Sequence, residues 1–156
     1  MKNLKKLICL FLIVPCILLC ACKSIEVNGK TFVFDKVTID WGLAQSNEEK
    51  QVILDKYEVE DKSKLIEYLK KYQDRENRVT TFGVDSKYFT KNGNNEIVDE
   101  GYYRQDESVI TLADSQDLLD EPGAYTLQAN EKGYIVTIKL DDTLKVFARY
   151  EYIEQA

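Results

Sequence analysis

The chain has 156 residues, a net charge of −6 at pH 7, four cysteines and no histidine. This length suits one domain. An acidic surface repels phosphate backbones and so argues against a nucleic-acid partner. The lack of histidine excludes Ser-His-Asp and Cys-His catalysis and the usual zinc sites. Catalysis by carboxylate, lysine or tyrosine side chains stays open.

The N-terminus has the order of a secretion signal. The start is basic, with Lys2, Lys5 and Lys6. Residues 7–21 then carry no charge and include a proline. A membrane-spanning helix needs roughly 20 apolar residues, and this run is shorter. We therefore predict a signal peptide over residues 1–21.

The end of this run, Leu19-Cys20-Ala21-Cys22, resembles the bacterial lipobox, in which an aliphatic residue stands three places before an acylated cysteine. The resemblance implies cleavage before Cys22 and lipid modification of that residue. Two or more acyl chains make a stable anchor. We expect a protein held on the extracytoplasmic face of the cell membrane, with the bilayer as partner of Cys22. Ordinary cleavage and release is the alternative.

Removal of the predicted signal peptide changes the net charge and the cysteine content of the remaining chain. The charge falls to −9, because residues 1–21 hold three lysines and no acid. No cysteine follows Cys22, so an internal disulfide and a cysteine nucleophile are excluded. Residues 22–30 are expected to be the lipidated cysteine and a short tether. Asn28-Gly29 favours a hairpin turn that pairs residues 24–27 with the next strand.

The domain proper is predicted over residues 31–156, and its first strand over residues 31–41. Apolar residues in this strand form two alternating sets of opposite parity, Phe32 and Phe34, then Val37, Ile39 and Trp41. A regular strand cannot move its inward face by one residue. We therefore predict a β-bulge at Asp35-Lys36.

A helical insert is predicted over about residues 46–74. Ser46-x-x-Glu49 is a capping box for a first helix. A second helix follows, with Asp61 or Ser63 as its N-cap. Its predicted apolar face consists of Leu65, Ile66, Leu69 and Tyr72. Charged residues fill the other faces, which is typical of a solvated cover on a core.

From residue 79 onward the pattern is that of strands separated by short turns. The predicted strands are residues 79–82, 87–90, 97–104, 109–112, 124–129, 134–140 and 144–153. Short turns impose antiparallel neighbours. We therefore predict a mainly β (α+β) fold, an antiparallel up-and-down meander of about eight strands curled into a barrel or half-barrel. Alternation places five tyrosines in its core, namely Tyr103, Tyr125, Tyr134, Tyr150 and Tyr152.

The chain resembles the lipocalin-like lipoproteins of Gram-positive gut bacteria. The points of likeness are Gly29-Lys30-Thr31-Phe32 at the first strand, the helical insert and the hairpin over residues 79–90. The likeness covers about residues 28–153. It implies a small lipocalin-like barrel and carries no catalytic residue to transfer.

Residues 113–121 form an acidic loop around Leu118 and Leu119. A calcium site is one interpretation of its carboxylates, but the spacing is not that of an EF-hand, so a solvated loop or a short helical turn is preferred. We predict no metal and no cofactor. The two leucines are candidates to cover the barrel mouth. Trp41, Tyr88 and Tyr102 are the other candidate ligand-binding residues.

Three functions follow from these predictions. The preferred one is non-catalytic binding of a small lipophilic ligand, which an apolar interior cavity of a few hundred Å³ would favour. The alternative is an interaction module for an envelope protein, which a solid core with an exposed aromatic patch would favour. A carboxylate-based hydrolase is a third and would need convergent acids. Asp141-Asp142 and Glu48-Glu49 are the candidate pairs, but turns and helix starts favour acids for local reasons.

Overall fold

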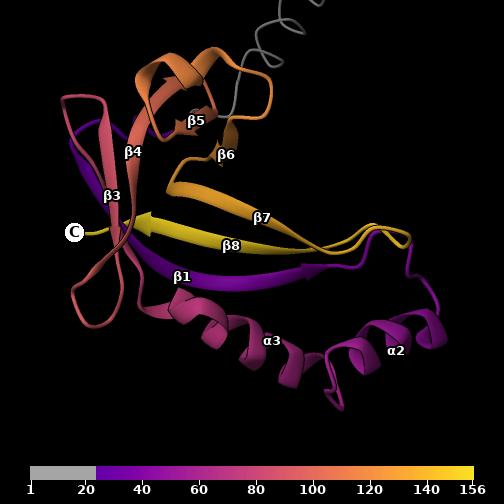
Figure 1. Cartoon of the computed structure of the whole chain (residues 1–156). Coiled ribbons are helices and arrows are strands. Elements are labelled where there is room, and N and C mark those ends of the chain that lie inside the picture. Colours follow the sequence, from indigo (N-terminus) through magenta and orange to yellow (C-terminus); the bar gives the residue numbers. More distant parts are fainter. Residues whose placement is uncertain (1–23) are drawn as a thin grey trace, which may run out of the picture.

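The structure, a computed structural model, describes residues 24–156. The predicted signal peptide and Cys22 lie outside the described residues. Eight antiparallel strands follow one another around a closed barrel, and the last strand pairs with the first (Figure 1). This is the architecture predicted from the alternation pattern and implied by the lipocalin-like resemblance. The strands are β1 (Lys30–Asp40), β2 (Val79–Phe82), β3 (Lys87–Lys91), β4 (Ile97–Asp106), β5 (Val109–Ala113), β6 (Tyr125–Ala129), β7 (Gly133–Asp141) and β8 (Val146–Glu154).

The predicted strands agree with the observed ones to within two residues at each end. The predicted bulge in β1 is confirmed, because the register against β8 shifts between Phe34 and Lys36. The shift leaves Asp35 without a partner in β8. As a result both Phe32 and Val37 point into the core and are buried. The bulge therefore lets one strand with two parities keep a single inward face.

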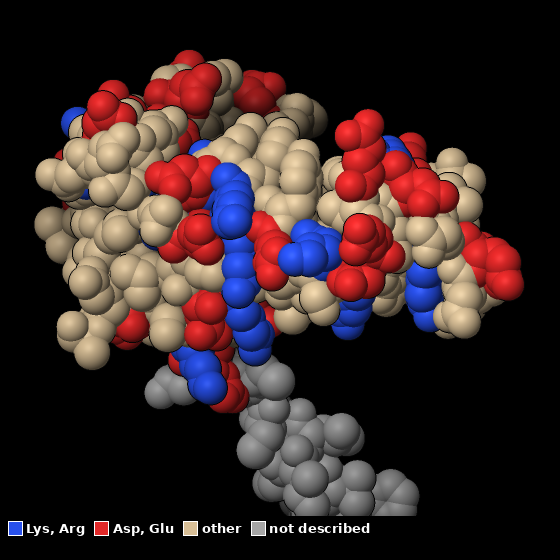
Figure 2. All heavy atoms as spheres, turned by 90° about the horizontal axis from the view of Figure 1, so that it is seen from below, with Lys and Arg blue, Asp and Glu red and all other residues tan. Residues whose placement is uncertain are grey.

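The helical insert comprises α2 (Asn47–Lys56), α3 (Lys62–Lys71) and the 3₁₀ helix η1 (Tyr72–Asn77). Ser46 and Glu49 form the predicted capping box, and Asp61 caps α3 by accepting a hydrogen bond from the Lys64 amide. Figure 1 shows α3 running beneath β1. On this side of the molecule acidic and basic side chains interleave (Figure 2). No helix in residues 24–156 is long and apolar enough to span a bilayer.

The leader, residues 24–29, does not form the predicted hairpin with β1. It crosses one end of the barrel, which we name the closed end. The Ile25 amide donates to the Asn130 carbonyl at 2.7 Å, and the Gln105 side chain bonds the leader backbone at Ile25 and Val27. A two-residue hairpin of type I′ needs positive φ at both central residues, but only Gly29 has it, at +74°. Val27 consequently turns inward and is fully buried.

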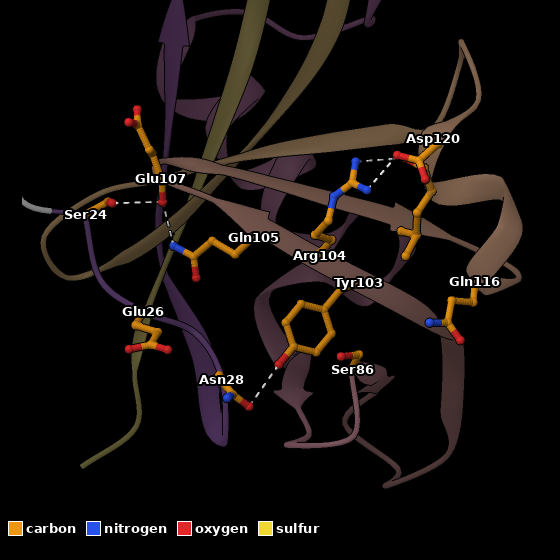
Figure 3. A pocket seen from close by; sticks show the side chains of 11 residues that line it. Ser24, Glu26, Asn28, Ser86, Tyr103, Arg104, Gln105, Glu107, Gln116 and Asp120 are labelled. Atoms are coloured by element: carbon orange, nitrogen blue, oxygen red, sulfur yellow. Dashed lines mark hydrogen bonds and ion pairs between the residues drawn. The ribbon is translucent and has the colours of Figure 1, made fainter.

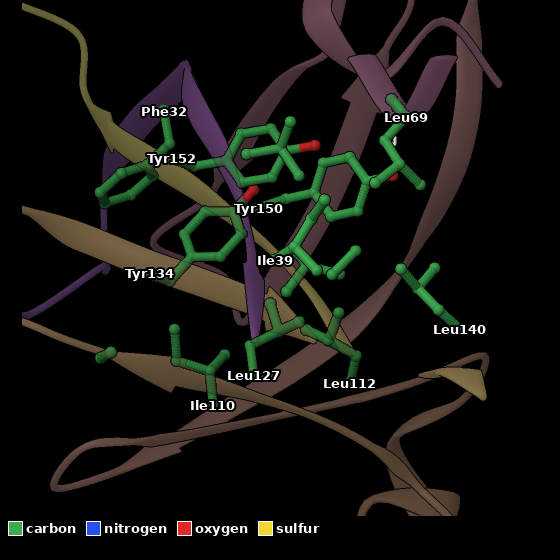
Figure 4. Packing of buried hydrophobic residues seen from close by; sticks show 14 of the residues in the cluster. Phe32, Ile39, Leu69, Ile110, Leu112, Leu127, Tyr134, Leu140, Tyr150 and Tyr152 are labelled. Atoms are coloured by element: carbon green, nitrogen blue, oxygen red, sulfur yellow. Dashed lines mark hydrogen bonds between the residues drawn. The ribbon is translucent and has the colours of Figure 1, made fainter. Parts of the chain in front are cut away.

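Aromatic rings fill the core next to the closed end. The Phe82 ring lies 4.9 Å from Tyr103 and 5.7 Å from Tyr134, both edge to face. Tyr134 stacks on Tyr152 at 5.0 Å (Figure 4). Four of the five predicted core tyrosines are buried, but the prediction for Tyr125 is wrong, because this side chain is 49% exposed. Tyr125 has the inward parity of Leu127 and Ala129, yet it begins β6 at the opposite, open end of the barrel.

Gly133 is required for the close pairing of β7 and β8. A Cβ atom at this position would lie 1.9 Å from the Tyr152 carbonyl oxygen. We expect Gly133→Ala to lower the free energy of unfolding by about 3 kcal/mol, because the clash is with backbone that cannot rotate away. Gly123→Ala is the control, since nothing lies within 4 Å of its Cβ and only its φ of +117° opposes the change. Urea denaturation of both variants tests this, and equal losses would contradict it.

Candidate functional site

A small cavity opens inside the barrel at the open end. β6 and β7 pair only near the closed end, through Gln128 with Ile135 and Ala129 with Tyr134, so the two strands are unpaired toward the open end. The cavity has a volume of about 130 Å³. Its apolar wall consists of Leu112, Leu127 and Val136. The polar wall comes from Arg75, Arg78, Thr80, Tyr88, Thr90, Asp99, Tyr125, Tyr134 and Tyr152.

A kink between α3 and β2 brings Arg75 to the cavity. Gln73 and Asp74 both have left-handed backbone angles, with φ of 54° and 55°, which is costly for residues other than glycine. The Asp74 carboxylate stabilises the kink by accepting from the Asn77 side chain at 2.6 Å and from the Gly93 amide at 3.0 Å. Both bonds hold the pKa of Asp74 below its usual range. The turn is therefore fixed by a contact with the β3–β4 loop.

The Arg75 guanidinium is only partly satisfied. Its carbon lies 5.0 Å from the centroid of the Tyr150 ring, a cation–π contact. One terminal nitrogen reaches the Gln73 side-chain oxygen at a long 3.4 Å. Its Nε is buried and has no hydrogen-bond partner, the single such side-chain atom in the described part of the chain. Buried polar atoms in native proteins nearly always have a partner.

The cavity phenols stay protonated well above neutral pH. Burial raises the pKa of Tyr134, and burial together with the nearby Asp99 carboxylate raises that of Tyr88. Tyr88 donates its hydroxyl hydrogen to Asp99 at 3.2 Å. Burial also raises the pKa of Tyr152, while the charges of Arg75 and Arg78 and the proximity of the Arg75 side chain as a hydrogen-bond donor offset part of that rise. Neutral phenols at these positions are hydrogen-bond donors as well as acceptors.

The structure brings only one of the sequence-predicted ligand residues to the cavity, namely Tyr88. Trp41 follows β1 and packs partly buried against the core. The partly exposed Tyr102 ring lies beneath the Lys87 ammonium, 5.7 Å from its centroid. Leu118 is exposed, and Leu119 is buried in the 3₁₀ helix η2 (Gln116–Asp120). The two leucines do not line the cavity.

Sequence reasoning missed the arginines of the site. Arg75 and Arg78 lie in the charge-rich insert, which the pattern assigned to a solvated cover. The chain has only four arginines among its 21 basic residues, and two of them stand three apart just before β2. Arginine is favoured over lysine where planar groups are recognised. The close spacing of these two arginines was the feature of the sequence from which the site could have been predicted.

A larger groove of about 630 Å³ crosses β4 between the leader and η2 (Figure 3). Several of its polar groups already bond one another. Tyr103 donates to the Asn28 side chain at 3.2 Å, and Arg104 pairs with Asp120 at 2.6 Å. Gln105 donates to the Glu107 carbonyl at 2.8 Å. Among the described residues that line the groove, no buried side-chain nitrogen or oxygen lacks a partner.

The carboxylates that were candidates for catalysis form hydrogen bonds with groups close to them in the fold. Glu49 accepts from the Ser46 amide, and Asp141 accepts from the Leu144 amide and from Lys56. Asp142 bonds Lys139 and Lys145, each at 3.0 Å. Within residues 24–156, no group of three or more His, Cys, Asp or Glu is arranged to hold a metal ion. The acidic loop over residues 113–121 is built around the short helical turn η2.

The fold and the site together define a closed eight-stranded antiparallel barrel with a small, partly polar cavity at one end. Comparison with protein-family models, with curated proteins and with solved structures finds no match to this chain.

Proposed function

We propose that this protein is a membrane-anchored, extracytoplasmic lipoprotein whose barrel binds a small molecule without catalysis. The observation that carries the binding role is the cavity at the open end, where a buried arginine nitrogen lacks a partner. Polar groups that converge in a concave pocket are the usual mark of a ligand site. The lack of histidine and of any cysteine after Cys22 supports a binding role rather than a catalytic one.

The proposal of a lipid anchor depends on the lipobox resemblance at Cys22. The position of the leader indicates which end of the barrel such an anchor would hold at the membrane. Ile25 is already bonded to the closed end of the barrel. A chain spans at most about 3.6 Å per residue, so three residues of chain would place an anchor at Cys22 no more than roughly 11 Å from Ile25. An acyl anchor at Cys22 would hold the closed end of the barrel against the bilayer. The open end and its cavity would then face away from the membrane.

We expect Cys22→Ala to abolish incorporation of labelled palmitate and to leave the unprocessed chain, because no other residue is the acceptor. Cys20→Ala is the matched control and should be labelled like the wild type. The measurement is palmitate labelling in the host, followed by mass spectrometry of the N-terminus. Equal labelling of wild type and Cys22→Ala would refute the anchor.

The size of the cavity limits the ligand. An engineered protein cavity of about 150 Å³ takes benzene, whereas drug-sized ligands occupy roughly 300–1,000 Å³. At about 130 Å³ the cavity suits a small molecule or the end group of a larger one. The cavity is smaller and more polar than a binding site for a wholly lipophilic ligand is expected to be.

Native mass spectrometry of the protein purified from its own host tests the binding role. We expect a co-purifying small molecule that is released on denaturation. A spectrum that shows only the lipidated chain, with no added small molecule binding in solution, would refute the binding role. An envelope protein partner is then the better hypothesis. The exposed, adjacent rings of Tyr68 and Tyr72, 6.0 Å apart, are the observation in its favour.

A further inference from the structure

We propose that the cavity binds the carboxylate of a small monoanionic molecule, with Arg75 as the binding residue and the phenols of Tyr134 and Tyr152 as further donors. This inference rests on the proposed ligand-binding function and names the chemical class of its ligand. Three features of the cavity lead to it: the arrangement of its charges, its unsatisfied donors and its two unlike walls.

The charges of the cavity favour an anion. Two guanidinium groups, Arg75 and Arg78, face one carboxylate, Asp99. Within the described part of the chain no carboxylate forms an ion pair with either guanidinium, although eight ion pairs stabilise other surfaces. Asp99 instead accepts from Tyr88. The cavity therefore keeps a surplus of one positive charge in a chain whose net charge is −6.

The donors of the cavity favour a planar oxyanion. Arg78 is already committed, since its Nε donates to the Gln73 carbonyl at 3.1 Å. Arg75 keeps its buried Nε free. A guanidinium presents Nε and a terminal nitrogen as a planar fork that matches the two oxygens of a carboxylate. Tyr134 and Tyr152 line the same cavity as neutral hydroxyl groups, so they can donate to the same oxygens.

The two walls of the cavity select the rest of the ligand. Leu112, Leu127 and Val136 give the lining of the cavity an apolar part besides its polar one. A phosphate would place charged oxygens against this wall and would bring more negative charge than the surplus of the cavity. A carboxylate that carries a short apolar body satisfies both walls. At about 130 Å³ the cavity is slightly smaller than the one of about 150 Å³ that takes benzene, so the carboxylate and part of the apolar body fill it and the rest of the body lies at its mouth.

The backbone supports the assignment independently. Two consecutive left-handed residues, Gln73 and Asp74, directly precede Arg75. Strain of this kind is kept at positions where the surrounding structure fixes a side chain for a purpose. Here the strained turn directly precedes an arginine that lines the cavity and whose Nε is buried. The same turn is fixed to the β3–β4 loop through Gly93, so the side chain is held in place before a ligand arrives.

Calorimetric titration of the protein purified from its host tests the inference, with benzoate, its neutral isostere benzamide and inorganic phosphate as probes. We expect benzoate to bind at least about tenfold more tightly than benzamide or phosphate, which is the ratio that one charge-assisted hydrogen bond supplies. Arg75→Gln should lose at least about tenfold in affinity for benzoate. Arg104→Gln, which removes an arginine of the groove in Figure 3, should bind like the wild type.

A second measurement needs no variant and holds even if Arg75→Gln fails to fold. Benzoate should protect Arg75 from the arginine reagent phenylglyoxal, while Arg104 and Arg149, both in ion pairs outside the cavity, react as before. Unchanged labelling of Arg75 at saturating benzoate would overturn the assignment.

The outcomes separate the two proposals. Equal affinity for benzoate and benzamide, or tighter binding of phosphate, overturns the carboxylate inference and leaves a small-ligand barrel. Absence of binding for every probe also overturns the inference. Only that absence combined with an empty native mass spectrum overturns the proposed function as well.

Discussion

Replacing Phe82 with alanine is expected to lower the free energy of unfolding by about 3–5 kcal/mol, the range for removing a buried phenylalanine side chain. Phe82 is fully buried at the end of β2. Its ring contacts four others, those of Phe32, Tyr88, Tyr103 and Tyr134. The loss is a fifth or more of the roughly 5–15 kcal/mol that stabilises a typical domain.

Phe89→Ala is the matched control for Phe82→Ala. Phe89 lies in β3, has the parity opposite to that of the buried Tyr88, and is partly exposed beneath the Lys91 ammonium. Its replacement should cost less than half as much, because part of the ring already contacts water. Urea denaturation followed through the fluorescence of Trp41, the sole tryptophan, measures both variants. Similar losses for the two would show that Phe82 is not a centre of the core.

The strands could be predicted because their information is local. In β8 the residues Val146, Ala148, Tyr150 and Tyr152 share one face, and all four are buried in the structure, whereas Arg149 and Glu151 lie on the other face. The bulge in β1 was also predictable, because two apolar sets of opposite parity allow one buried face only if a residue is skipped. Short turns then left an up-and-down order as the simplest arrangement.

The cavity could not be predicted because it depends on contacts between distant residues. The kink that positions Arg75 is stabilised by a hydrogen bond from the Gly93 amide to the Asp74 carboxylate, and these residues are 19 positions apart. No pattern in the sequence around Asp74 predicts this hydrogen bond. Tyr125 shows the same limit. Its parity correctly placed it on the inner face of β6, but its exposure follows from the missing β6–β7 pairing at the open end.

The conformation of the leader is a third feature that could not be predicted from the sequence. Asn28-Gly29 is a frequent hairpin pair, yet the turn it makes here has positive φ only at the glycine. The competing interaction is burial of Val27 in the closed end, together with the bonds from Gln105. Burial of a valine side chain is worth about 1.5–3 kcal/mol, which is enough to decide between two turn types.

The buried phenols also predict that the barrel unfolds in alkali between about pH 11 and 12. Tyr88, Tyr134 and Tyr150 are at most 6% exposed. Burial raises the pKa of Tyr150 to about 12 and raises those of the other two as well, against about 10 in an unfolded chain. Above pH 10 the unfolded chain therefore holds fewer protons than the native one, so stability falls as the pH rises.

The size of this effect exceeds that of any single substitution. Each buried phenol lowers the free energy of unfolding by about 1.4 kcal/mol per pH unit between its unfolded and folded pKa, so these three together give about 4 kcal/mol per unit. Over two pH units the loss is comparable to the whole stability of a typical domain. Below pH 10 the phenols are protonated in both states, and stability should not depend on them.

Tyrosinate absorbance and circular dichroism, recorded in one titration, test this prediction. We expect part of the absorbance change to coincide with loss of the β-sheet spectrum. The same titration in concentrated guanidinium is the control and should show all ten tyrosines ionising together near the unfolded pKa. Tyr134→Phe should reduce the alkaline slope by about 1.4 kcal/mol per pH unit, because one buried phenol with a raised pKa no longer titrates. Full and reversible ionisation of the native barrel near pH 10, with its sheet intact, would show that water reaches these phenols and that the core is open rather than packed.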